Sequence, residues 1–220
     1  MLRGLFDFHI GEHVSEIRFE ARAYMRQVAR MGIQTLAFMS KDAMGLSYYD
    51  TRIGRRNPKL KRDIVRAARA EAKRRGIGFW AYYNVSLDDY LSLEQPDWRQ
   101  VDAQGGADRV YGWYHPMCLN SPYRDIVRGQ LIELARDYAV EGLWLDITYI
   151  FPERCYCPFC RRLFRERTGR EMPEQPAKGS AALAEVMAFR RWTRLDYLTD
   201  LTGAVRAFRG PDFPFTWNHA

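Results

Sequence analysis

Three cysteines cluster in the segment Cys155-Tyr-Cys157-Pro-Phe-Cys160, and Cys118 is the only other cysteine of the chain. Thiolate sulfur is a preferred ligand of zinc, and a structural zinc site is tetrahedral with four protein ligands. The alternatives are free thiols in a reducing compartment, or a disulfide between two of the cysteines. Because all four cysteines fall in two neighbouring loops of the fold predicted below, we expect them to bind zinc. Four protein ligands leave no open position, so this zinc would be structural.

A carboxylate, Asp146, directly follows the apolar segment Gly142-Leu-Trp-Leu. Cleavage of a glycosidic bond uses two carboxyl groups that flank the bond. A carboxylate at the end of a buried strand suits one of these roles, and the alternative is an Asp that caps a helix or orders a loop. The second carboxylate is left open, because it can lie beyond residue 220. The candidates near other strand ends are Asp7, Asp42, Asp88 and Asp89.

Side chains suited to sugar binding recur near the ends of the other predicted strands. Sugar hydroxyls need hydrogen-bonding partners, and the apolar C–H faces of a sugar stack on aromatic rings. Since alternate residues of a barrel strand point inward, at least half of the aromatic residues near these strand ends are expected in the core. The predicted substrate-binding residues are His9, Lys41, Tyr83, Asn84, Trp113, Trp217 and Asn218.

Short apolar segments alternate with longer amphipathic ones along the chain. The predicted strands are 5–10, 35–39, 78–84, 142–147 and 213–218, and the predicted helices are 15–31, 59–75, 122–138, 159–168 and 184–208. Such alternation indicates an α/β fold with a parallel sheet covered by helices. No Gly-x-Gly-x-x-Gly follows the first strand, which argues against a dinucleotide-binding doubly wound sheet. Polar residues at successive strand ends favour a (β/α)8 TIM barrel, whose active site lies at that rim.

A complete barrel of this type has eight strands and typically about 250 residues. The 220-residue chain has five predicted strands, and the last lies at its end. We therefore predict that residues 1–220 form a single barrel domain that is incomplete at its C-terminus. This domain would contain the N-terminal portion of the barrel, with about five β-α units. Any homo-oligomer would form through C-terminal regions that follow these units.

The chain carries a net charge of +7, from 34 Lys and Arg against 27 Asp and Glu. In the predicted helix 59–75, apolar residues recur every fourth position and basic residues fill the other faces, which is typical of a solvated helix. We therefore expect no nucleic-acid partner. No segment reaches the roughly 18 apolar residues of a membrane helix, and the N-terminus lacks the pattern of a secretory signal. These features predict a cytoplasmic protein without a membrane partner, and no motif indicates an organic cofactor.

The segment Cys118-Leu-Asn-Ser-Pro-Tyr-Arg124, followed by the three clustered cysteines, resembles the zinc-binding pattern of the family 42 β-galactosidases. In that family the general acid/base is a Glu that follows the fourth strand, just ahead of the cysteine cluster. Asp146 stands at that place, with Leu145-Asp146 where the family has Asn-Glu. This resemblance implies a zinc ion on the four cysteines and an acid/base role for Asp146.

The segment Ser40-Lys-Asp-Ala-Met-Gly-Leu46 resembles the Lys-His-His-Asp-Gly-Phe stretch of α-L-fucosidases, with Asp42 and Ala43 in place of the two histidines. The third predicted strand is also similar to theirs. In fucosidases a Trp-x-Asp at the end of the fourth strand carries the nucleophile, and Trp144-Leu-Asp146 matches it. This resemblance implies a nucleophile role for Asp146.

The combination of both patterns is most similar to the hypothetical glycosyl hydrolase 6 type. It implies a retaining glycoside hydrolase, with a carbohydrate as its substrate and Asp146 as either nucleophile or acid/base. The alternative function is a non-catalytic carbohydrate-binding barrel that has lost a catalytic carboxylate. A zinc-dependent nucleic-acid binder is disfavoured, because one cysteine lies 37 positions before the cluster.

Overall fold

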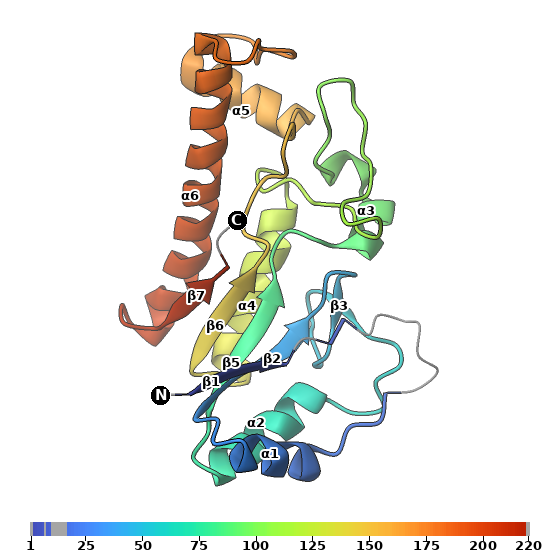
Figure 1. Cartoon of the computed structure of the whole chain (residues 1–220), viewed down its shortest axis with the longest axis vertical. Helices are drawn as coiled ribbons and strands as arrows, with labels where there is room; N and C mark the ends of the chain where they lie inside the picture. Colours follow the sequence, from blue (N-terminus) through green and yellow to red (C-terminus); the bar gives the residue numbers. More distant parts are fainter. Residues whose placement is uncertain (1, 7, 10–16, 219–220) are drawn as a thin grey trace.

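A β-sheet of mostly parallel strands, with helices packed on one face, forms the body of the molecule (Figure 1). The computed structural model describes residues 2–6, 8–9 and 17–218. Asp7 and the predicted boundaries at residues 10 and 15 lie outside the described residues.

The parallel strands follow one another across the sheet in chain order. They are β1 (Arg3–Phe6), β2 (Thr35–Lys41), β5 (Gly78–Asn84), β6 (Gly142–Asp146) and β7 (Phe215–Trp217). Each is paired in parallel with the next one. A doubly wound sheet reverses its strand order at a switch point, whereas a (β/α)8 barrel keeps the order sequential. The strand order therefore agrees with the predicted barrel-type α/β fold.

The apolar core lies between this sheet and four helices. These are α1 (Ala21–Arg30), α2 (Ile64–Arg74), α4 (Tyr123–Asp137) and α6 (Ala181–Arg209). Side chains alternate between the two faces of a strand, so Leu143 and Leu145 are buried in this core. On the opposite face Trp80 and Trp144 border a cavity of about 380 Å³. That face corresponds to the interior of a barrel.

Local capping explains where two helices begin. α2 begins at Ile64, later than predicted, because the Asp63 side chain accepts a hydrogen bond from the backbone N–H of Arg66 at 2.7 Å and caps the helix. α5 (Pro158–Thr168) has Pro158 in its first turn, where a missing N–H costs nothing, and it ends at Gly169 with a positive φ of 71°.

The loops at the C-terminal ends of the strands contain short elements that the sequence pattern does not predict. They are β3 (Leu46–Ser47), β4 (Arg55–Arg56), α3 (Asp89–Glu94) and the 3₁₀ helix η1 (Pro96–Trp98). Two isolated bridges, Leu87 with Pro116 and Arg99 with Met117, close the long loop after β5. In Figure 1, α3 and α5 lie beyond the arrowheads of β5 and β6. We call this end of the sheet the rim. Within the described part of the chain, no helix combines the length and apolarity needed to cross a membrane.

Candidate active site and metal centre

Asp146 is the last residue of β6 and lies beside Asn84, its register partner on β5. Because Leu143 and Leu145 point into the helix-covered core, strand alternation directs Asp146 to the opposite face. The residue is buried, with 8% of its surface exposed. The sheet thus holds a carboxylate at the rim, on its barrel-interior face.

Three side chains from neighbouring strands or their ends donate hydrogen bonds to the Asp146 carboxylate. The Tyr82 hydroxyl and the Asn84 amide, the latter at 3.4 Å, donate to Oδ2. The Asn218 amide donates to Oδ1. Asn218 is itself held in place, since its side-chain oxygen accepts from the backbone N–H of Ile147 at 3.1 Å. Both carboxylate oxygens therefore face donors.

His9 extends this network by one residue. Its Nδ1 accepts a hydrogen bond from the backbone N–H of Ala43 at 3.1 Å, so neutral His9 carries its proton on Nε2. Nε2 lies 3.5 Å from the Tyr82 hydroxyl oxygen and can donate to it. The His9 ring also lies next to the ring of Tyr114. A chain of hydrogen bonds thus runs from His9 through Tyr82 to Asp146.

Lys41 is brought to the same end of the sheet, but its ammonium group is occupied by the protein. It donates to the carbonyl oxygens of Asn84 and Leu87 and to the Tyr123 hydroxyl, at 3.0–3.2 Å, and lies 3.3 Å from Asp88 Oδ2. An ammonium has three donors. Only 1% of Lys41 is exposed, so its contacts hold the loop after β5 on β2 and leave no donor for a sugar.

The three predicted aromatic residues do not join the Asp146 network in the structure. Tyr83 is fully buried on the helix side, where its hydroxyl donates to Gln130 at 2.7 Å. Trp217 is the register partner of Leu145 and packs against the core. Trp113 lies on the long loop after β5 and is 66% exposed.

Three of the four candidates for a second carboxylate have structural partners of their own. Asp42 accepts from the Leu46 backbone N–H and the Tyr48 hydroxyl, and burial raises its pKa although both hydrogen bonds oppose the shift. Asp88 pairs with Lys41, as described, and Asp89 contacts His115 Nδ1 at 2.6 Å. The fourth, Asp7, is outside the described residues. The second carboxylate therefore stays unassigned.

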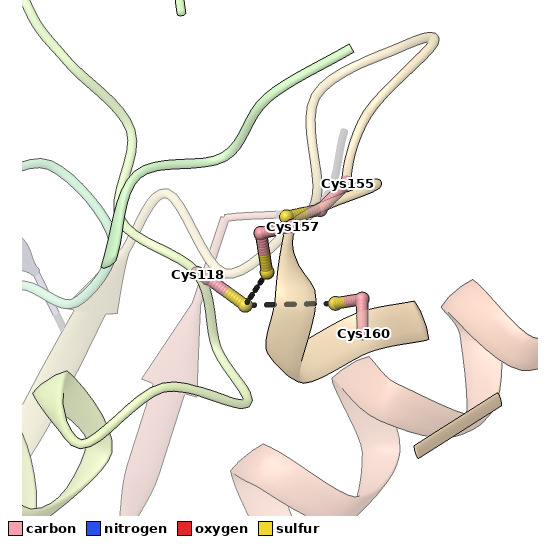
Figure 2. Close-up of side chains that lie close together, drawn as sticks. All are labelled: Cys118, Cys155, Cys157 and Cys160. Atoms are coloured by element: carbon pink, nitrogen blue, oxygen red, sulfur yellow. Dashed lines mark hydrogen bonds between the residues drawn. The ribbon is translucent and has the colours of Figure 1, made fainter. Parts of the chain in front are cut away.

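The four cysteines meet at the rim, between the loop before α4 and the start of α5 (Figure 2). All are buried, none is in a disulfide, and their sulfur atoms lie within 4.8 Å of one another. Cys118 Sγ is 3.3 Å from Cys157 Sγ and 3.5 Å from Cys160 Sγ. The sequence prediction that Cys118 joins the distant cluster is confirmed by this arrangement.

The cluster fits a tetrahedral metal ion. Zn–S bonds of about 2.3 Å place the four sulfurs of a tetrahedron roughly 3.8 Å apart, close to the observed separations. Asn120 also donates to two sulfurs, from its backbone N–H to Cys118 at 3.3 Å and from its side chain to Cys160 at 3.2 Å. Burial, together with the neighbouring thiols, raises the pKa of Cys118 well above its usual range. A bound metal ion would replace the proton that this burial retains.

Sequence reasoning missed two residues of these sites. The sequence prediction names Tyr83, whereas Tyr82 contacts Asp146, and a period of two places Tyr82 and Asn84 on the same face of the strand. Asn120 lies two residues after Cys118, which is the signal that could have identified it as a donor to the cluster. Both contact a predicted site residue directly.

Comparisons with known proteins identify the family and the fold of the chain. The model of the family described as hypothetical glycosyl hydrolase 6 matches residues 20–147, which is more than half of the chain and includes Asp146. A search of the curated proteins finds no match. Among solved structures, the chain is similar to alpha-L-fucosidase isoenzyme 2 from Paenibacillus thiaminolyticus, with a TM-score of 0.85 and 25% identity. That similarity covers 99% of this chain and 32% of the fucosidase.

Two further structures share the fold at lower identity. A polyextremophilic beta-galactosidase from the Antarctic haloarchaeon Halorubrum lacusprofundi has a TM-score of 0.68 and 18% identity, over 99% of this chain and 36% of that chain. A hypothetical protein from Ruminiclostridium thermocellum has a TM-score of 0.58 and 12% identity, over 90% of both chains. The chain thus spans about a third of the length of the fucosidase and of the galactosidase.

Proposed function

Because the chain belongs to the hypothetical glycosyl hydrolase 6 family, we propose that it forms the N-terminal β-α units of a retaining glycoside hydrolase in which Asp146 is a catalytic carboxylate. The observation that carries the proposal is the set of three donors on a buried, strand-end carboxylate at the rim. A carboxylate that merely caps a helix or orders a loop does not need three hydrogen-bond donors from two neighbouring strands.

The surroundings of Asp146 favour the role of nucleophile over that of acid/base. Hydrogen bonds donated to both oxygens suit the ionised form, whereas a general acid needs an apolar pocket that keeps it protonated. In the retaining mechanism the carboxylate attacks the anomeric carbon, and the leaving oxygen takes a proton from the second carboxyl group. Water then releases the sugar from the covalent intermediate. Tyr82 and Asn218 would hold Asp146 in line for the attack.

The substrate we propose is a glycoside, and an α-L-fucoside is the first to test. Of the solved structures described above, the alpha-L-fucosidase is the one with 25% identity and a TM-score of 0.85. His9 is the proposed contact for a sugar hydroxyl, because it lies beside Tyr82. Asn84, of which 1% is exposed, would serve the substrate site through its hydrogen bond to Asp146. Trp113, exposed on the loop after β5, is a proposed stacking surface.

We also propose that Cys118, Cys155, Cys157 and Cys160 hold a structural zinc ion. With four protein ligands, the ion would join the long loop before α4 to the start of α5 and would take no part in bond cleavage. Its contribution to the active site would be indirect, by fixing the loops around the rim.

The two roles of Asp146 are separated by replacing it with glycine and adding azide, in the protein that carries this chain, with a nitrophenyl glycoside as substrate. If Asp146 is the nucleophile, azide attacks the substrate directly and the glycosyl azide has the inverted anomeric configuration. If it is the acid/base, azide attacks the glycosyl-enzyme and the configuration is retained. Asp97→Gly, at an exposed position in η1, is the matched control. Full activity of Asp146→Gly without azide would reject both roles.

The second candidate function is a carbohydrate-binding barrel without catalysis, and the observation that favours it is that Asp42, Asp88 and Asp89 are all engaged elsewhere. A panel of nitrophenyl glycosides distinguishes the two functions. Turnover of one member supports the hydrolase, whereas sugar binding measured by calorimetry without any turnover supports the binding protein.

A further inference from the structure

Arg190, in α6, is a cation with buried donor atoms that lack partners. Its Nε and Nη2 are buried, and neither has a hydrogen-bond partner among the described residues. Its Nη1 contacts only the Met187 sulfur, at 3.9 Å. A buried charge is costly unless it is paired and hydrogen-bonded. Among the described residues, Glu153 is the carboxylate whose charge acts on Arg190, and it does not hydrogen-bond the two buried nitrogens. The position of Arg190 therefore has room for a further negative partner.

The face of α6 that carries Arg190 packs against the four cysteines. Val186 and Phe189, on the same helix, belong to the buried cluster that contains all four of them. The guanidinium carbon of Arg190 lies 5.4 Å from the centre of the Tyr156 ring, and Tyr156 stands between Cys155 and Cys157 in the chain. Arg190 is within electrostatic range of Cys155 and Cys160. The unpaired cation therefore neighbours the proposed metal centre.

The charge of a zinc centre with four thiolates complements that of Arg190. Zn²⁺ with four Cys⁻ ligands carries a net charge of 2−, and here at least 99% of each cysteine is buried. A second cation nearby, Arg161, is already engaged, since it donates to Tyr156 and Ala103 carbonyl oxygens and to Glu174. Arg190, in contrast, has two buried donor nitrogens without a partner among the described residues.

We propose that Arg190 is a positioning residue of the metal centre, which balances the charge of a zinc–tetrathiolate and couples α6 to it. This inference rests on the proposed zinc site. Residues around a metal's ligands commonly affect its binding strongly, and their replacement costs about 10- to 100-fold in affinity.

The test compares the variants Arg190→Gln and Arg190→Lys with the control Arg191→Gln, which removes the same charge from the next, exposed position of α6. Zinc affinity is measured by competition with a chromophoric chelator in reducing buffer. We expect Arg190→Gln to bind zinc about 10- to 100-fold more weakly than wild type. Arg190→Lys keeps the charge and should lose less, and Arg191→Gln should bind as wild type does.

A second measurement separates this role from ordinary packing. Without metal, Arg190 has no zinc–tetrathiolate charge to balance, so Arg190→Gln should unfold at the same temperature as the wild type, or at a higher one, when both are metal-free. A variant that lowers this temperature while leaving zinc affinity intact would overturn the inference and show a packing role. Equal zinc affinity of Arg190→Gln and wild type would also overturn it. A wild-type chain that binds no zinc would instead reject the proposed metal site itself.

Discussion

The hydroxyl group of Tyr82 donates a hydrogen bond to Oδ2 of Asp146, from one strand of the sheet to the next. The Tyr82 hydroxyl oxygen and Asp146 Oδ2 are held together, because both residues are buried and lie on adjacent parallel strands. The sheet itself therefore fixes the orientation of the carboxylate before any sugar binds, which is the preorganisation that catalysis by a fixed group requires.

The variant Tyr82→Phe tests this contact, since it removes only the hydroxyl group. A hydrogen bond to a charged group contributes about 1.5–3 kcal/mol, so we expect the free energy of unfolding to fall by that amount at neutral pH. Urea denaturation of the chain measures it. Tyr111→Phe is the control, because the Tyr111 hydroxyl is on an exposed residue and bonds only to Tyr149. An unchanged free energy of unfolding in Tyr82→Phe would show that the hydrogen bond to Asp146 does not stabilise the fold.

A second prediction concerns Lys41, which the structure places in a buried pair with Asp88. Lys41→Met removes one partner and leaves the other charge buried, which costs about 3–5 kcal/mol. Urea denaturation should show that loss at neutral pH. Lys73→Met, at an exposed position of α2, should change the stability little. A small effect of Lys41→Met would mean that the ammonium group serves another purpose, such as ligand binding.

The same variant has a predictable pH dependence. Burial raises the pKa of Asp88, and Lys41 opposes that shift, so removing Lys41 raises the pKa further. A carboxyl group whose folded pKa exceeds the unfolded value of about 3.9 stabilises the fold below that value, and this contribution is lost as pH rises. The stability gap between Lys41→Met and wild type should therefore narrow from pH 7 to pH 4. A gap that stays constant would contradict the assignment to Asp88.

Removal of the proposed zinc ion gives a fourth prediction. Structural zinc sites contribute directly to folding, so a chelator should lower the unfolding temperature of the wild-type chain. Cys157→Ser removes one ligand and should abolish stoichiometric zinc in metal analysis. The chelator should then have no effect on its unfolding temperature. Wild-type protein purified with zinc available but containing none would contradict the prediction.

Much of the fold could be predicted from the sequence, because short apolar segments mark the strands and longer amphipathic segments mark the helices. The strand end at Asp146 follows from the apolar segment that precedes it, and the meeting of Cys118 with the distant cysteines follows from the order of the strands and their loops. The short elements β3, β4, α3 and η1 could not be predicted, because they are stabilised by contacts with other segments, such as the bridge between Leu87 and Pro116.

The site was harder to predict, because residue type does not reveal which face of a strand a side chain occupies. Lys41 is a polar residue at a strand end and was expected to bind sugar, yet its charge is used within the fold. Tyr83 and Tyr82 are adjacent and chemically identical, so residue type does not separate them. The packing of Tyr83 against Gln130 of α4 fixes which face of the strand is buried, and strand alternation then places Tyr82 beside Asp146.

The central claim is tested most directly by the hydrolysis of an α-L-fucoside and a panel of other nitrophenyl glycosides by the protein that carries this chain. The substitution to compare with wild type is Asp146→Asn, which keeps the shape of the side chain, with Asp97→Asn as control. We predict that Asp146→Asn lowers kcat/KM on the preferred substrate by at least about 100-fold, while Asp97→Asn retains wild-type activity. Wild-type kcat/KM in Asp146→Asn would contradict the assignment of Asp146 as a catalytic carboxylate.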